Sequence, residues 1–510
     1  MVLGAGPAGL TAAWRLAHAG RDVHVVEADP HKVGGISRTE EYNGYRFDIG
    51  GHRFFSKAPE VKRIWHEILP SSEWLTVQRI SRIYYRGKFF DYPLSATDAL
   101  KKLGLGTSML CGLSYVKARM FPRKEVRSFE DWIVNHFGYR LYSIFFKTYT
   151  EKVWGRPCTE ISADWAAQRI KGLSLLSAVR HALPQWRRST TKVIKTLIEE
   201  FEYPRLGPGQ VWEHAAAQVE HNGGTVQMAS RVAQIHHEAG SVTEVVLETE
   251  NGWERITGDN YISSIPMRAL IRAMCPPASI EVQAAADALD YRDYLTVILV
   301  IDRKEAFPDN WIYIHEPEVL LGRIQNYKNW SPHMVPDPDR TALGLEYFTT
   351  EGDVNLWELD DEALIALGRR ETAQIGLVDI DEVVDATVVR MPKAYPVYDE
   401  HYARNVSTIR TWLEESVSNL QTVGRNGMHK YNNQDHSMMS ALLAAENLLG
   451  AQWDPWKVNT DAEYHEEVSE NSKPTGRLAP GGHVAPLPQS RRTRARTARR
   501  VSTNVKAPPL

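Results

Sequence analysis

Three glycines open the chain with the spacing G-x-G-x-x-G, at Gly4, Gly6 and Gly9. They follow a short apolar run and precede residues 10–19, whose apolar spacing is helical, so they stand at a strand-to-helix turn. In such a turn the first glycine permits the tight bend, the second lets a pyrophosphate approach the backbone, and the third lets the helix pack on the strand. The helix N-terminus favours phosphate charge. The segment predicts an adenine dinucleotide site, and a glycine turn that binds nothing is the alternative.

Glu27 ends the next expected strand, residues 22–27. At that place in a βαβ unit, a carboxylate accepts hydrogen bonds from the adenosine ribose. FAD and NAD share the adenosine diphosphate half, so this fingerprint alone does not separate them. The sequence shows no second glycine fingerprint, and we therefore expect NAD(P)H to bind only transiently, if it binds at all.

Two more glycine segments follow closely, Gly34-Gly35-Ile36-Ser37-Arg38 and Asp48-Ile49-Gly50-Gly51-His52. With them the chain resembles the large FAD family that contains amine oxidases, protoporphyrinogen oxidase, phytoene desaturases and UDP-galactopyranose mutase. The resemblance implies FAD as the cofactor and places Gly34, Gly35 and Arg38 along its diphosphate and ribityl chain. An ordinary loop is the alternative for the first of these segments.

Within that family the motifs are most similar to those of the UDP-galactopyranose mutase branch. The Gly50-Gly51-His52 turn looks like the mutase loop that faces the flavin ring. The resemblance implies that Gly51 contacts the cofactor and that His52 lies beside the flavin and steers its proton. A histidine after two glycines lies on exposed, mobile backbone, whereas a lone histidine is more often structural.

Further segments similar to the mutase supply the candidate substrate site. Trp154 and Arg169 resemble the mutase tryptophan that packs beside the substrate and the arginine that follows it. Tyr92 resembles the tyrosine of its Tyr-Pro turn, Arg323 its diphosphate-binding arginine, and Tyr347 its later tyrosine. A guanidinium suits bidentate phosphate contact. Outside the family pattern, such a tryptophan is ordinarily a core residue and such an arginine a surface residue.

The segment before the last expected helix resembles the closing glycine-arginine motif of the mutase, which reaches FAD and the substrate phosphate. By this resemblance Gly424, Arg425 and Asp435 bind the cofactor, and Tyr431 reaches the substrate. Asn433 is assigned to the substrate as well, although the mutase pattern has an aspartate there. The helix N-terminus beside this segment favours negative charge on a reduced flavin.

The resemblance implies a pyranose–furanose mutase of nucleotide sugars, in which reduced flavin is the nucleophile. Arg169, Arg323 and Tyr431 then hold the displaced diphosphate, because the leaving group must stay bound for its return. The alternative is net oxidation of an amine, porphyrinogen, polyene or sugar by hydride transfer to FAD. A non-catalytic FAD-binding protein is a third reading. An enzyme that oxidises an amine or a polyene has no need for several cationic groups around its pocket.

These residues require an α/β fold: an FAD-binding Rossmann-like domain of the glutathione-reductase type, an inserted helical region, and a second, mixed-sheet substrate domain. The discontinuous FAD domain is expected at 1–58, 198–270 and 415–450, the helical region at 59–197, and the sheet domain at 271–414. Val232, at the start of the expected strand 232–236, is counted with the cofactor-binding residues. Residues 461–510 are rich in Pro, Gly, Ser and Arg, which predicts a disordered basic tail.

Composition sets the remaining expectations. A net charge of −3 with 43% hydrophobic residues fits a globular enzyme with a small-molecule substrate and argues against nucleic acid as a partner. Cys111, Cys158 and Cys275 are too scattered for a disulfide framework or a metal site, and suggest buried thiols in a reducing compartment. No apolar run is long enough to span a membrane and no signal peptide is visible, so a cytoplasmic location is expected. The short first strand suggests that a few upstream residues are missing, and the oligomeric state stays open.

Overall fold

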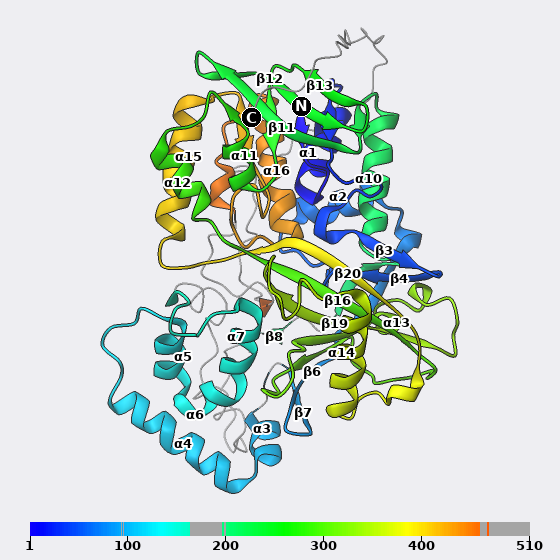
Figure 1. Ribbon diagram of the computed structural model, residues 1–510, viewed down its shortest axis with the longest axis vertical. Coiled ribbons are helices and arrows are strands. Elements are labelled where there is room, and N and C mark those ends of the chain that lie inside the picture. Colours follow the sequence, from blue (N-terminus) through cyan, green and yellow to red (C-terminus); the bar gives the residue numbers. More distant parts are fainter. Residues whose placement is uncertain (93, 95, 164–195, 198–199, 459–466, 469–510) are drawn as a thin grey trace, which may run out of the picture.

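The structure is a computed structural model and describes residues 1–92, 94, 96–163, 196–197, 200–458 and 467–468 (Figure 1). Arg169 and the predicted tail, apart from residues 467–468, therefore lie outside the described residues. The predicted fold class is confirmed: parallel and mixed sheets alternate with helices in two sheet layers.

A five-stranded parallel sheet forms the dinucleotide-binding part, with the strand order β10-β2-β1-β14-β21. Its strands are β1 (Val2–Leu3), β2 (His24–Val26), β10 (Thr225–Gln227), β14 (Tyr261–Ser263) and β21 (Leu420–Thr422). Successive residues point to opposite faces, and Val2 and Leu3 are both buried, so the sheet is covered on both sides. One face packs against α1 (Pro7–His18), α2 (Pro59–Ile68), α10 (Gly209–His221) and α16 (Gln434–Leu448).

The other face of this sheet is covered by a small four-stranded sheet and three helices. These elements are β11 (Ser230–Glu238), β12 (Ser241–Thr249), β13 (Gly252–Ile256), β15 (Met274–Cys275), α11 (Met267–Arg272), α12 (Ile280–Asp287) and α15 (Tyr402–Ser416). Helix α12 and all but the last two residues of α15 fall within residues 271–414, which we assigned to the substrate domain. Their apolar sides pack in the core of the dinucleotide-binding part instead, because that face of its sheet must be buried.

A seven-stranded mixed sheet forms the second layer, in the order β20-β16-β19-β18-β17-β6-β7. Its strands are β6 (Ser81–Tyr85), β7 (Lys88–Asp91), β16 (Tyr291–Ile301), β17 (Trp311–Ile314), β18 (Arg323–Asn326), β19 (Thr341–Thr349) and β20 (Val383–Pro396). Helix α14 (Asp361–Gln374) covers one face through an apolar core. The opposite face points toward the dinucleotide-binding part, and in Figure 1 β20 and β16 run between the two parts of the molecule.

The described part of the region 59–197 contains strands as well as helices, because β5 (Trp74–Gln78), β6 and β7 lie within it. β5 pairs with β9 (Glu200–Pro204), and β6 and β7 extend the second sheet. Its helices after the strands are α3 (Ala96–Leu103), α4 (Leu105–Met120), α5 (Phe129–Phe137), α6 (Tyr139–Tyr142) and α7 (Thr148–Trp154). Further elements are the hairpin β3 (Thr39–Tyr42) and β4 (Tyr45–Asp48), the pair β8 (Thr196–Leu197) and β22 (Glu467–Val468), and α13 (Tyr327–Trp330).

Candidate functional site

The first glycine turn has the geometry that its spacing predicts. Gly4 adopts φ +95°, a left-handed conformation that favours glycine. A Cβ on Gly9 would lie 1.8 Å from the Gly4 carbonyl oxygen, so the start of α1 packs directly on the turn. By contrast, a Cβ on Gly6 would meet only the Cα of Gly35, at 3.9 Å. Gly4 and Gly9 are thus required for the fold of the turn, whereas the space at Gly6 remains open beside the helix N-terminus.

The second glycine pair closes on the first turn from the other side. The Gly34 N–H donates to the Ala5 carbonyl at 2.8 Å, and Gly34 itself has φ +100°. A Cβ on Gly35 would lie 3.4 Å from the Cα of Gly6. Two side-chain-free backbone segments therefore flank the N-terminus of α1, which is a cradle suited to a diphosphate. The residues present fit the diphosphate of FAD.

Glu27 lies at the side of this cradle. The Glu27 carboxylate accepts the N–H of Ala5 at 2.6 Å and the N–H of Asp29 at 3.0 Å. Val232 is half-buried and packs against the core that contains Leu3. The ribose contact of Glu27 and the cofactor contact of Val232 stay predictions.

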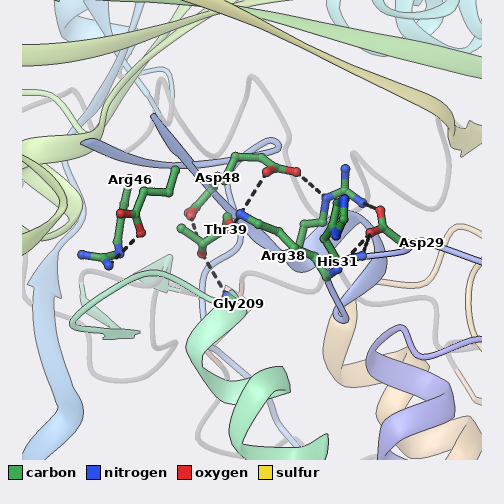
Figure 2. A network of polar contacts seen from close by, with 10 residues as sticks. Asp29, His31, Arg38, Thr39, Arg46, Asp48 and Gly209 are labelled. Atoms are coloured by element: carbon green, nitrogen blue, oxygen red, sulfur yellow. Dashed lines mark hydrogen bonds and ion pairs between the residues drawn. The ribbon is translucent and has the colours of Figure 1, made fainter. Parts of the chain in front are cut away.

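Arg38 is held by two carboxylates, as Figure 2 shows for Asp29. It forms ion pairs with Asp29 and Glu40, each at 2.5 Å. Burial opposes the charge of Asp29, but the N–H groups of His31 and Lys32, together with Arg38, hold the pKa of Asp29 below its ordinary value. The guanidinium is therefore fixed beside the cradle, and its contact with FAD stays a prediction.

A buried network around Asp48 ties the β3–β4 hairpin to α10 (Figure 2). The Thr39 hydroxyl donates to Asp48 at 3.4 Å and accepts the N–H of Gly209 at 3.0 Å. The hydroxyl of Tyr203 donates to the other oxygen of Asp48. Burial raises the pKa of Asp48 to about 8, although both hydroxyls work against the shift. The network fixes the strand that leads directly into the Gly50 turn.

The Gly50-Gly51-His52 turn packs on the open face of the second sheet. Gly50 has φ +85°, and a Cβ on it would lie 3.8 Å from the Arg323 Nη2 and 3.8 Å from the Tyr294 hydroxyl. A Cβ on Gly51 would lie 3.2 Å from the ring of Trp330. The tertiary structure thus brings the predicted residues Gly51, His52 and Arg323 together.

His52 is neutral in this environment. Its Nδ1 lies 3.0 Å from the Gly50 carbonyl oxygen, so the tautomer with hydrogen on Nδ1 leaves Nε2 as an acceptor. Burial, together with the positive charges of Arg425 and Arg323, lowers the pKa of His52 to about 3, against the opposing effect of the Gly50 carbonyl. Besides burial, two positive charges therefore act on the turn, those of Arg425 and Arg323.

The two arginines that act on the turn differ in their partners. Arg323 pairs with the fully buried Glu346, whose other oxygen accepts the side-chain N–H of Gln325 at 2.5 Å. Arg425 donates to the backbone carbonyls of Asn432 at 2.8 Å and Ala394 at 3.1 Å. Among the residues that the structure describes, Arg425 forms no ion pair, so its charge is not neutralised by a carboxylate.

Aromatic rings surround Arg425. Its guanidinium carbon lies 5.4 Å from the ring centre of Tyr395 and 5.2 Å from that of Tyr431, and these two rings stack on each other. Tyr431 also contacts Trp154, with ring centres 6.3 Å apart. The predicted residues Trp154, Tyr431 and Arg425 thus converge, and Tyr395 joins them although the sequence analysis did not identify it.

A second cationic and aromatic group lies near Tyr92. Arg79 lies over the rings of Tyr92, at 5.5 Å, and of Trp311, at 5.6 Å, and Arg53 lies over the same tryptophan at 5.1 Å. Tyr92 in turn contacts Tyr313 at 4.9 Å. Sequence reasoning missed Arg79, in the loop between β5 and β6, and Tyr313, on β17, because β6 and β17 come together only when the seven-stranded sheet forms.

Tyr347 is a correction to the predicted substrate site. It is fully buried in the core beneath α14, together with Leu345, whereas Glu346 points to the side of Arg323. Neighbouring residues of a strand point to opposite faces, so a tyrosine directly after Glu346 cannot share its face. The structure therefore separates Tyr347 from the other predicted residues.

Residues in the segment before α16 and in its first turn also stabilise the local structure. Gly424 adopts φ +85°, and a Cβ on it would lie 2.9 Å from the Cβ of Ala8, so it must be small for the turn to approach α1. Asn433 caps α16 in a capping box with His436. Asp435 is buried in the first turn of that helix. Contacts of these residues with FAD or substrate stay predictions.

Comparison with known proteins agrees with this architecture. A family model described as flavin-containing amine oxidoreductase matches residues 7–449. The chain is 23% identical over 442 residues to coproporphyrinogen III oxidase of Mycobacterium leprae, covering 82% of this chain and 91% of that protein. The crystal structure of reduced UDP-galactopyranose mutase has a TM-score of 0.76 at 22% identity, covering 90% of this chain and 95% of the other. A putative protoporphyrinogen oxidase from Exiguobacterium sp. 255-15 has a TM-score of 0.66 at 15% identity, covering 88% and 97%.

Proposed function

The chain belongs to the family of flavin-containing amine oxidoreductases and is a flavoenzyme, and we propose that it interconverts the pyranose and furanose forms of a nucleotide sugar. FAD, when bound and reduced, supplies a nucleophilic nitrogen for this chemistry. Gly6, Gly34, Gly35 and the N-terminus of α1 would hold its diphosphate, and Glu27 its ribose. These assignments extend the sequence predictions, which the cradle geometry supports.

The observation that carries the proposal is the positive field where Gly50, His52, Arg323 and Arg425 meet. Both arginines act on His52: burial is the largest cause that lowers its pKa to about 3, and the positive charges of Arg425 and Arg323 lower it further. An amine substrate binds as a cation and would be repelled by this field, whereas a nucleoside diphosphate would be attracted. The field thus favours an anionic substrate.

Each residue then has a task in the reaction. Arg425, whose charge no carboxylate neutralises in the described chain, and Arg323 hold the departing diphosphate close, so that it can return to the rearranged sugar. Arg169 is proposed for the same task from the sequence alone. The Tyr431 hydroxyl donates to the phosphate, and Trp154 and Tyr92 pack beside the substrate. Neutral His52 accepts or returns a proton at Nε2.

A second function has support from the same field. Coproporphyrinogen carries carboxylates, which Arg323 and Arg425 would also attract. The chain is similar in sequence to a coproporphyrinogen III oxidase and in fold to a putative protoporphyrinogen oxidase. In that reaction the substrate loses hydride to oxidised FAD and no diphosphate has to be retained. The redox state in which the enzyme turns over separates the two functions.

The test uses the FAD-loaded enzyme in both redox states. It is reduced with dithionite under anaerobic conditions and incubated with a panel of nucleotide sugars, and the pyranose and furanose forms are separated by chromatography. The proposal expects interconversion by the reduced enzyme only. Turnover by the oxidised enzyme only, with peroxide formed and porphyrinogen converted, would overturn it. Gel filtration of the enzyme after mixing with NAD(P)H tests the expectation of transient nicotinamide binding.

A further inference from the structure

Helix α4 carries an exposed apolar stripe that the catalytic site does not use. Its members are five residues between 51% and 90% exposed: Leu105, Met109, Leu113, Val116 and Met120. Their spacings of four, four, three and four residues place them within roughly a quarter of the helix circumference. Phe121, which follows directly, is 73% exposed. Scattered exposed apolar residues are common, but a continuous stripe on one helix marks an interaction surface.

The rest of α4 is an ordinary packed helix. Cys111 and Ala118, on the side opposite the stripe, are buried. Cys111 lies in a core with Phe145, which attaches the helix to the α6–α7 layer. Figure 1 shows α4 along the lower edge of the molecule, with the helical layer above it and no labelled element below. The stripe therefore points away from the protein.

Basic residues accompany the stripe. Residues 101–127 contain seven Lys and Arg and one Glu, although the whole chain has a net charge of −3. Lys117 and Arg119 are both exposed and, at 100° per residue, stand on the two sides of the stripe. Three of the seven pair with carboxylates: Lys102 with Asp98, Arg123 with Glu130 and Asp131, and Arg127 with Glu125. Positive charge is thus concentrated beside the apolar residues, although the net charge of the whole chain is negative.

We propose that α4 docks on the surface of an anionic lipid bilayer, with the stripe among the upper acyl chains and Lys117 and Arg119 at the level of the lipid phosphates. A helix with an apolar face and flanking basic residues lies in the membrane interface in this way. No helix of the described residues is long and apolar enough to cross a membrane, so the contact is peripheral.

A second copy of this chain fits the apolar stripe of α4 less well than an anionic bilayer does. In a two-fold symmetric contact the same patch meets itself, and α4 contains no Asp or Glu with which the basic flanks of the other copy could pair. Like charges at such a contact repel, whereas lipid phosphates neutralise them. The charge of the patch therefore favours lipid over self-association.

The docking surface and the candidate site share one helical layer. α4 packs on α5 and α6, and the core of those helices includes Trp154 at the site. Docking through α4 would place the Trp154 side of the site nearer the bilayer than the dinucleotide sheet.

The experiment measures co-sedimentation of the full-length FAD-loaded protein with vesicles. Vesicles of phosphatidylcholine and phosphatidylglycerol in equal amounts are compared with vesicles of phosphatidylcholine alone. We expect binding to the anionic vesicles only, weakened by salt. M109Q/L113Q should lower the partition coefficient at least about tenfold, because two apolar side chains lose their burial. K117Q/R119Q should lower it about tenfold or more through two lost phosphate contacts.

Matched variants keep the test decisive. I280Q/V354Q changes two apolar residues that are 86% and 72% exposed elsewhere, and should bind as the wild type does. A full chain in which Arg491, Arg492, Arg494 and Arg496 are changed to Gln should still lose binding when M109Q/L113Q is added. All variants should retain their flavin spectrum and melting temperature, since every changed side chain is exposed or in the tail. Absence of binding to anionic vesicles would overturn the proposal, and so would a dimer that M109Q/L113Q dissociates without any vesicle binding.

Discussion

Arg323 and Glu346 face each other across the neighbouring strands β18 and β19, with the Arg323 Nε 2.5 Å from the Glu346 Oε2. Glu346 is fully buried and the side chain of Arg323 is 16% exposed. The pair fixes the guanidinium next to the Gly50 turn. Removing the Arg323 guanidinium should therefore weaken substrate binding and leave cofactor binding unchanged.

Arg323→Ala should weaken binding of a nucleoside diphosphate by about tenfold or more, because a charge-assisted contact is lost. FAD should remain bound. The variant leaves Glu346 as a buried charge without its partner, which costs about 3–5 kcal/mol of unfolding free energy. Calorimetric titration and urea unfolding measure the two effects. The control R323A/E346Q should recover stability but not nucleotide binding, and loss of flavin in R323A would show that Arg323 is a cofactor residue.

Gly6→Ala and Gly9→Ala should differ, although both change the same turn. A Cβ on Gly9 would lie 1.8 Å from a backbone oxygen, so G9A should destabilise the flavin-free protein by about 3 kcal/mol or more. A Cβ on Gly6 has no contact closer than 3.9 Å, so G6A should fold normally and lose FAD affinity. Unfolding of the flavin-free protein and flavin titration test this. Equal stability of the two variants would contradict it. Gly112→Ala, in open space on α4, is the control.

Arg425→Gln should shift the flavin midpoint potential to a more negative value. The change removes a positive charge that no carboxylate of the described chain neutralises, and that charge stabilises a negatively charged reduced flavin. Redox titration against a reference dye measures the shift. Arg390→Gln, whose arginine pairs with Asp361, is the charge-matched control and should leave the potential unchanged. An unchanged potential in R425Q would place Arg425 away from the flavin.

Asp48→Asn should flatten the pH dependence of stability. The folded protein raises the pKa of Asp48 from 3.8 to about 8, through burial. Between these values the unfolded chain releases a proton that the folded chain keeps, so stability falls as pH rises through this window. Below pH 3.8 both states are protonated and the loss is absent.

Urea unfolding of wild type and D48N at pH 5 and pH 8 measures this difference. The wild type should lose more stability than the variant on going to pH 8. Asp309→Asn, which breaks the buried ion pair with Arg82, should lower stability at both pH values. A D48N protein with the pH dependence of the wild type would mean that Asp48 ionises normally in the fold.

Local patterns predicted the elements that depend on near neighbours in the chain. The glycine turn was placed correctly because its three glycines are needed only by the strand before it and the helix after it, which are neighbours in the sequence. α1 begins at Pro7 rather than at residue 10, since Gly6 is its N-cap. The strand β20 was missed: it contains Pro392 and Pro396, which argue against a strand, but it lies at the edge of its sheet, where proline is tolerated.

The sequence by itself determined the family resemblance, the FAD cradle motif and most residues of the candidate site, because these follow from residue types at fixed local spacings. Only the tertiary structure decided which of them share a face. It joined Tyr395 to Arg425, and it placed Tyr347 beneath α14, away from Arg323. The physical reason is that a strand alternates its side chains between two faces, and the face that turns toward the cofactor is set by the sheets and helices packed against it.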